Sequence, residues 1–149
     1  MTDAPNATML KFGYPQSVVA DTPYWTVQVR PQQPTLGSLV LVCREPATAF
    51  GQVSPAAFAA LQPLVARLEA MLHRFVDYQK INYLMLMMVD PDVHFHVIPR
   101  YQESRDFQGT VFADAGWPGP PALGTAVALD GSAMNELTAA LSRLWDEVV

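Results

Sequence analysis

An alternating segment in the middle of the chain most strongly constrains how it can fold. Across residues 92–97, Asp-Val-His-Phe-His-Val, polar and apolar side chains alternate. This period of two predicts a β-strand with one apolar face and one face that carries Asp92, His94 and His96, about 7 Å apart along the strand. Three ionisable groups on one face are costly to assemble unless they are paired, solvated or used for a function. Pro99 cannot donate to a sheet hydrogen bond, so we expect the strand to end there.

The composition favours a single domain with a well-packed core. Of the 149 residues, 50% are hydrophobic and only 15% are charged, which excludes an intrinsically disordered chain. The net charge is -5 and no run of Lys or Arg occurs, so nucleic acid is not expected as the main partner. Cys43 is the only cysteine, which rules out an internal disulfide and a zinc site built from thiolates.

The N-terminal segment and the longest apolar run bear on location and domain boundaries. Residues 1–8 are polar and include an acidic residue, so they do not resemble a secretory signal. The apolar run from Tyr83 to Val89 is too short to span a bilayer, and we expect a soluble cytoplasmic protein without membrane association. Residues 1–22 show no periodicity and are predicted to form a loosely packed tail ahead of a single domain, residues 23–149.

Three further segments are predicted to be strands. Residues 24–30 and 39–43 are rich in β-formers and are expected to pair in antiparallel fashion. Residues 81–89 are nearly all apolar, which is typical of a strand covered on both faces. The turn residues at 90–92 join this segment to the histidine strand, so the two are expected to form a hairpin with the histidines in the middle of the sheet.

Two helices complete the predicted domain. Ser54 is a helix cap and Pro55 suits the first helical position, after which apolar residues recur at helical spacing as far as Phe75. Pro63 lies inside this helix and is expected to kink or break it. A second helix is expected to begin at Ser132. The order of elements predicts an α+β domain built on an antiparallel sheet with two main helices.

Asp92, His94 and His96 are open to three interpretations. They can be the polar edge of a strand whose histidines are satisfied structurally. They can hold a metal ion through two imidazoles and a carboxylate oxygen, although the only other histidine is His73. Alternatively, His94 is a nucleophile: a neutral imidazole can attack phosphorus, and water then releases the product. A neighbouring imidazole can hydrogen-bond the phosphate or the leaving oxygen.

The segment from His94 to Arg100, His-Phe-His-Val-Ile-Pro-Arg, closely resembles the signature of the histidine triad superfamily. Residues 36–42, Leu-Gly-Ser-Leu-Val-Leu-Val, are similar to the strand that precedes this signature in the family, with a helix between the two. The resemblance covers roughly residues 24–105. It implies a homodimer whose sheet continues across the interface, and a nucleotide hydrolase or transferase that acts at an α-phosphate through a nucleotidyl-histidine intermediate.

The same resemblance implies roles for single residues. His94 matches the nucleophile and His96 the histidine that contacts the phosphate and the leaving group, while Asp92 stands where the family has its first histidine. The substrate-binding residues that it implies are Arg30, Ser38, Val40 and Arg100. The expected substrates are a dinucleoside polyphosphate or a nucleoside phosphoramidate with a purine base, and neither a cofactor nor a metal is expected. Two alternatives remain: a nucleotide-binding protein impaired by Asp92, and a metal-dependent enzyme that uses all three residues.

Overall fold

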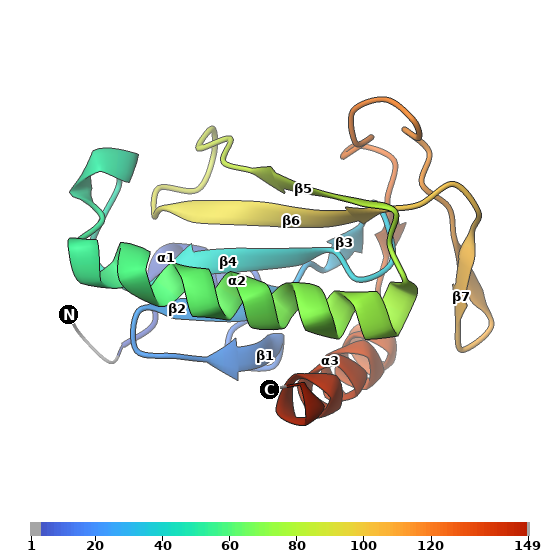
Figure 1. Cartoon of the computed structure of the whole chain (residues 1–149), viewed down its shortest axis with the longest axis horizontal. Helices are drawn as coiled ribbons and strands as arrows, with labels where there is room; N and C mark the ends of the chain where they lie inside the picture. The colour runs from blue at the N-terminus through green and yellow to red at the C-terminus, as the bar shows by residue number, and fades with distance from the viewer. Residues whose placement is uncertain (1–3, 149) are drawn as a thin grey trace.

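The computed structural model of the chain describes residues 4–148. At its centre is a five-stranded antiparallel sheet with the order β1-β2-β4-β6-β5 (Figure 1). This architecture confirms the predicted α+β fold. The strands of this sheet are β1 (Val18–Asp21), β2 (Trp25–Val29), β4 (Leu39–Cys43), β5 (Lys80–Leu84) and β6 (His94–Arg100). The α-helices are α1 (Ala7–Lys11), α2 (Pro55–Val76) and α3 (Gly131–Glu147).

Short elements surround this framework. A 3-10 helix precedes α2, and two small two-stranded sheets lie outside the main sheet. These elements are the 3-10 helix Phe50–Gln52 and the pairs β3 (Gln32–Gln33) with β9 (Val127–Ala128) and β7 (Arg105–Phe107) with β8 (Thr110–Phe112). Among residues 4–148, no helix is both long and apolar enough to cross a membrane.

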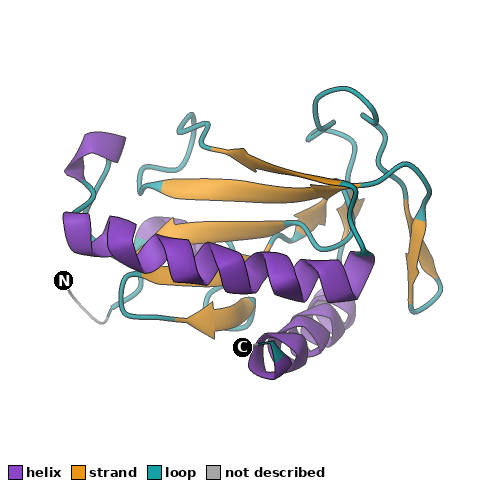
Figure 2. Ribbon diagram, in the orientation of Figure 1, coloured by secondary structure: helices purple, strands orange, loops and turns teal. Residues whose placement is uncertain are grey.

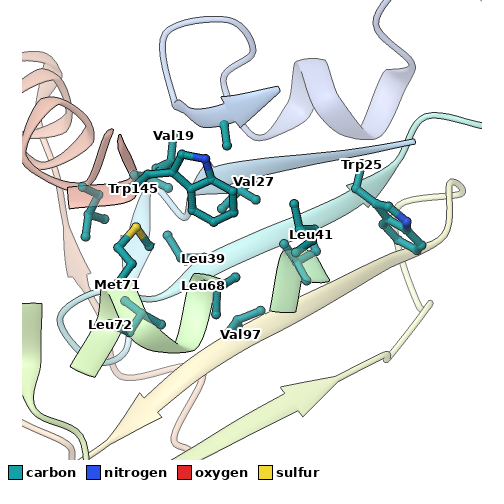
Figure 3. Packing of buried hydrophobic residues seen from close by; sticks show 14 of the residues in the cluster. Val19, Trp25, Val27, Leu39, Leu41, Leu68, Met71, Leu72, Val97 and Trp145 are labelled. Atoms are coloured by element: carbon teal, nitrogen blue, oxygen red, sulfur yellow. The ribbon is translucent and has the colours of Figure 1, made fainter. Parts of the chain in front are cut away.

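The main core lies between the sheet and two helices. In Figure 2, α2 runs across one face of the sheet, α3 lies next to α2 and β1, and α1 is behind the sheet. Burying one large apolar side chain is worth roughly 1.5–3 kcal/mol, so the contact between α2 and the sheet supplies much of the driving force for folding. The side chains at this contact are Leu68, Met71 and Leu72 of α2 and Val27, Leu39, Leu41 and Val97 of the strands (Figure 3).

Helix α2 begins where the sequence predicts. The Ser54 hydroxyl accepts a hydrogen bond from the Ala57 amide at 3.1 Å, and Pro55 occupies the first helical position. The helix continues past Pro63, so the predicted break does not occur. Pro63 lies on the exposed side of the helix, where water can solvate the carbonyl that has lost its donor. The helix ends at Asp77, which adopts a left-handed conformation with φ of 47°.

The prediction of a strand covered on both faces over residues 81–89 is wrong. Strand β5 ends at Leu84 and forms an edge of the sheet, and residues 85–93 leave the sheet as a loop. Met88 and Val89 in this loop are 84% and 81% exposed. The predicted adjacency of β5 and β6 is confirmed, and it places the histidine strand inside the sheet.

Strand β6 also extends one residue further than predicted, past Pro99 to Arg100. The carbonyl of Arg100 faces β5, because it accepts a hydrogen bond from the Gln79 amide at 2.8 Å. The nitrogen of Pro99 therefore faces the opposite side, since successive residues of a strand point their amides in opposite directions. On that side the ladder of β4 already ends at the pair of Leu39 and Val97, so no donor is needed.

The prediction that residues 1–22 form a loosely packed tail is wrong for most of this segment. Helix α1 lies on the face of the sheet opposite α2, where Met9 is fully buried against Val40 and Val42. Strand β1 pairs with β2 and completes the sheet. Residues 1–3 lie outside the described part of the chain. The N-terminal segment is therefore an integral layer of the fold and covers the sheet surface that carries the histidines.

Candidate active site

Strand β6 carries His94 and His96 between β4 and β5, in the interior of the sheet. The intervening Phe95 packs near Trp25 on the side of the main core. Because side chains alternate along a strand, both histidines point to the opposite face, toward α1. The predicted common face for the two histidines is therefore present.

The two imidazole rings form a compact group with Phe12, which follows α1. The ring centroids of His94 and His96 are 5.2 Å apart, and the Phe12 ring lies 6.1 Å and 5.9 Å from them. Only 2% of His94 and 8% of His96 is exposed. Both rings are therefore held in place by packing, and only a small part of each is open to a ligand.

Both histidines line a cavity of about 400 Å³. Residues 11–12 form one wall and residues 30–32 form another, while residues 86–90 of the loop between β5 and β6 form the rim. This volume falls within the range of about 300–1,000 Å³ that is typical of small-molecule sites. The lining combines apolar side chains with a few polar and charged groups, so it suits a ligand that has both an apolar ring and an anionic part.

The hydrogen bond of His94 determines which ring nitrogen carries the proton. Nδ1 of His94 lies 2.7 Å from the main-chain carbonyl oxygen of Asp92. A carbonyl oxygen can only accept, so Nδ1 donates and bears the hydrogen. The other nitrogen, Nε2, then has a free lone pair and can act as a nucleophile.

Arg30 holds His96 in the tautomer opposite to that of His94, with the proton on Nε2. Nε of Arg30 donates a long hydrogen bond, 3.4 Å, to Nδ1 of His96, which therefore accepts and leaves the proton on Nε2. Burial, and then the positive charge of Arg30 and the proximity of His94, lower the pKa of His96 from 6.5 to about 4. Asp90 acts weakly in the opposite direction. At neutral pH His96 is thus an uncharged hydrogen-bond donor.

The carboxylate of Asp92 contacts α1 and not the imidazole rings. It accepts hydrogen bonds from the Thr8 amide at 3.1 Å and from the Thr8 hydroxyl at 2.9 Å. The Thr8 hydroxyl in turn accepts from the Asp92 amide at 3.2 Å. The Asp92 side chain is buried and is not among the groups that line the cavity. Its contribution to the histidines is made through its main-chain carbonyl.

Of the remaining residues implied by the resemblance, only Arg30 lines the cavity. Ser38 is buried in the turn before β4, where its hydroxyl donates to the Thr35 carbonyl at 2.8 Å. Val40 lies opposite His96 in the register of β4 and β6 and belongs to the buried apolar cluster that includes Phe12. Arg100 lies at the far end of β6 and is paired with Asp114 at 2.7 Å. Ser38 and Arg100 therefore support the backbone of the site from a distance.

Two segments that line the cavity were not predicted to do so from the sequence. Lys11 and Phe12 belong to the predicted loose tail, residues 86–89 to the predicted buried strand, and Asp90 to the predicted turn. Lys11 and Phe12 are brought to the site by the hydrogen bonds between Thr8 and Asp92, which are 84 positions apart. Local sequence patterns do not predict a contact between residues so far apart in the chain. The one local signal was Asn6, a residue suited to cap a helix, which accepts from the Met9 amide.

Among residues 4–148, no three His, Cys, Asp or Glu side chains come together in an arrangement that could hold a metal ion.

Comparison with known proteins gives a consistent result for the fold alone. No protein-family model matches the sequence, and no curated protein matches it. Solved structures do match: a histidine triad protein from Bradyrhizobium japonicum has 22% identity and a TM-score of 0.72, with 94% of this chain and 96% of that chain covered. A histidine triad protein from Sinorhizobium meliloti has 19% identity and a TM-score of 0.71, with 94% and 95% covered.

A third structure is described as a diadenosine triphosphate hydrolase from Plasmodium falciparum. It has 12% identity and a TM-score of 0.63, with 89% of this chain and 78% of that chain covered. The likenesses extend over most of this chain and therefore include the central sheet and α2. The chain has the histidine triad fold.

Proposed function

We propose that the chain is a nucleotide-binding hydrolase or nucleotidyl transferase that attacks an α-phosphate with His94. The observation that carries this proposal is the hydrogen bond from His94 Nδ1 to the Asp92 carbonyl, which leaves Nε2 free to attack at the edge of a cavity. The likeness to a structure described as a diadenosine triphosphate hydrolase supports the same class of reaction.

The reaction has two steps at phosphorus. Nε2 of His94 attacks the α-phosphorus and forms an N–P bond, while the bond to the bridging oxygen breaks and its electron pair leaves with the departing group. Water then attacks the same phosphorus, the N–P bond breaks, and the imidazole recovers its lone pair. The proton released by the water passes to solvent. No metal or cofactor takes part in this scheme.

His96 assists as a hydrogen-bond donor. Its proton on Nε2 can bond a phosphate oxygen, but the imidazole is neutral at pH 7 and so has no acidic proton to give to a poor leaving group. A phosphate chain departs as a stable anion, whereas an amine departs only when it is protonated. Of the two expected substrate classes, this geometry favours a dinucleoside polyphosphate over a nucleoside phosphoramidate.

The apolar part of the cavity suits the nucleoside. The Phe12 ring and the side chains of residues 86–89 offer a surface against which a purine base can stack or pack. Arg30 lies between this surface and His96, where it can reach the ribose or the phosphate. A cytoplasmic location remains part of this proposal.

We also infer that two copies of the chain associate along β5. The main sheet has β1 at one edge, where α3 packs against it, and β5 at the other edge. The outer side of β5 offers unpaired backbone groups that a second copy can pair with, which continues the sheet. Sedimentation equilibrium should give twice the chain mass of 16.4 kDa, and a monomer at micromolar concentration would contradict this inference.

A protein that binds nucleotide without turning it over is the second candidate. It is favoured by one observation, that an aspartate anchored to α1 stands where the family signature has its first histidine. Turnover of diadenosine triphosphate by wild-type protein and by His94→Ala, followed by chromatography, separates the candidates. We expect turnover only by the wild type, with ADP binding retained in both. Binding without turnover by the wild type would favour the second candidate, and full turnover by His94→Ala would exclude His94 as the nucleophile.

A further inference from the structure

We propose that Lys11 binds the departing phosphate of the substrate and that Asp92 is a positioning residue, which holds Lys11 at the cavity. The inference rests on the proposed function, because it assigns a ligand to the leaving group of that reaction. Lys11 is the last residue of α1, and it lines the same cavity as His94 and His96.

Among residues 4–148, two cations face the cavity, and Lys11 is the less tightly held of the two. The charged residues in its lining are Lys11, Arg30 and Asp90. Arg30 already donates from Nε to His96 and from Nη1 to the Gln32 carbonyl, the latter at 2.8 Å. Lys11 has three donors, and the structure shows Nζ bonded to Asp90 Oδ1 at 3.2 Å. A chain of net charge -5 needs such a local cation to hold a polyphosphate.

The ion pair between Lys11 and Asp90 is suited to exchange. It joins α1 to the loop between β5 and β6, and both of its residues line the cavity; the Lys11 side chain is 55% exposed and that of Asp90 is 15% exposed. Because the ammonium end of the pair lies largely in water, the pair contributes little to stability, and Nζ can turn from the Asp90 carboxylate to a phosphate at modest cost. The phosphate gains a charge-assisted hydrogen bond from an ammonium group beside the two histidines.

Asp92 fixes the helix that carries Lys11. Helix α1 has only five residues, too few to be stable without tertiary contacts. The Asp92 carboxylate holds its first turn through the Thr8 amide and hydroxyl, and Met9 is buried against the sheet. Because Asp92 lies two positions before His94, the same short segment places the nucleophile and the cation relative to one another.

The test compares two substrates that share the adenylyl group and differ in what departs. Diadenosine triphosphate releases ADP, whereas the p-nitrophenyl ester of AMP releases a phenolate without a phosphate. We expect Lys11→Met to lower kcat/KM for diadenosine triphosphate by about tenfold, the loss of one charged hydrogen bond, and to leave kcat/KM for the ester unchanged. The matched control is Arg74→Met, which removes an equally exposed cation that pairs with Glu147 on α3.

The positioning role is tested through Thr8. Thr8→Val removes the hydroxyl that bonds Asp92 and should reproduce the selective loss of Lys11→Met, while Thr8→Ser should restore wild-type selectivity. A structural defect alone would lower kcat/KM for both substrates together. Equal losses on both substrates, or no loss on either, would overturn the proposal.

The role of Lys11 in phosphate binding can be tested even if the protein has no hydrolase activity. If the wild-type protein turns over neither substrate, calorimetry with ADP and adenosine replaces kinetics. Lys11→Met should then weaken ADP binding several-fold and leave adenosine binding unchanged, whereas unchanged ADP binding would contradict the role of Lys11.

Discussion

The main-chain carbonyl of Asp92 lies 2.7 Å from Nδ1 of His94, and the carboxylate of the same residue accepts hydrogen bonds from the amide and the hydroxyl of Thr8. One residue thus sets the tautomer of the proposed nucleophile through its main chain and fixes a wall of the cavity through its side chain. Substitution of the side chain leaves the carbonyl in place, so the two contributions can be separated by experiment.

Removing the carboxylate should destabilise the protein. In Asp92→Ala, the buried amide and hydroxyl of Thr8 lose their acceptor, and we expect the free energy of unfolding to fall by about 1–3 kcal/mol. Asp92→Asn retains an acceptor oxygen and should lose less. Urea unfolding measures both values, and equal stability of Asp92→Ala and the wild type would contradict the anchoring role of the carboxylate.

Removing the guanidinium beside His96 should raise the pKa of that histidine. Arg30→Met eliminates the positive charge that helps to hold the pKa near 4, so we expect a shift toward the ordinary value of 6.5. An NMR titration of the imidazole Cε1 proton measures the pKa directly. Arg44→Met is the control, because Arg44 pairs with Asp21. Identical His96 titrations in wild type and Arg30→Met would show that the contact has no influence.

The low pKa of His96 should make stability depend on pH. Between pH 6.5 and about 4 the imidazole binds a proton in the unfolded chain but not in the folded protein. The free energy of unfolding should therefore decrease as the pH falls through this window. In His96→Gln the contribution is absent, so urea unfolding at several pH values should give a shallower dependence. Parallel curves for the two proteins would contradict the assignment.

The buried pair of Arg100 and Asp114 should be essential for stability and not for chemistry. Arg100 and Asp114 have side chains that are 4% and 1% exposed, and their atoms approach to 2.7 Å. Asp114→Ala leaves the buried guanidinium without its carboxylate partner and should lower the free energy of unfolding by about 3–5 kcal/mol. Replacing both residues by Leu should lower it less. Thermal or urea unfolding tests this order. A cost below about 1 kcal/mol for Asp114→Ala would show that the charge finds another partner.

Local patterns predicted the central framework well. Alternation of polar and apolar residues identified β6 and the shared face of His94 and His96, and the cap at Ser54 located the start of α2. These features depend on neighbours in the sequence, because strand and helix periods bring residues a few positions apart onto one face. The antiparallel pairings of β2 with β4 and of β5 with β6 followed from the connections between these strands, whereas the pairing of β4 with β6 was not predicted.

The surroundings of the site could not be predicted in the same way. Hydrophobic content alone does not separate a buried strand from an exposed loop beside a cavity, so residues 85–89 were misassigned. The role of Lys11 in the cavity depends on the contact between Thr8 and Asp92, 84 positions apart. The resemblance implied that Arg100 binds substrate, but in the structure its guanidinium is paired with Asp114. No sequence motif predicts the position of Asp114 in the fold.

A nucleotidyl intermediate on His94 can be detected by intact-mass analysis of the protein shortly after mixing with diadenosine triphosphate. We expect a mass increase equal to one adenylyl group on the wild-type protein and none on His94→Ala, with Arg74→Met behaving as the wild type. An adduct that persists in His94→Ala, or turnover by the wild type without any adduct under rapid quench, would contradict a nucleotidyl intermediate on His94.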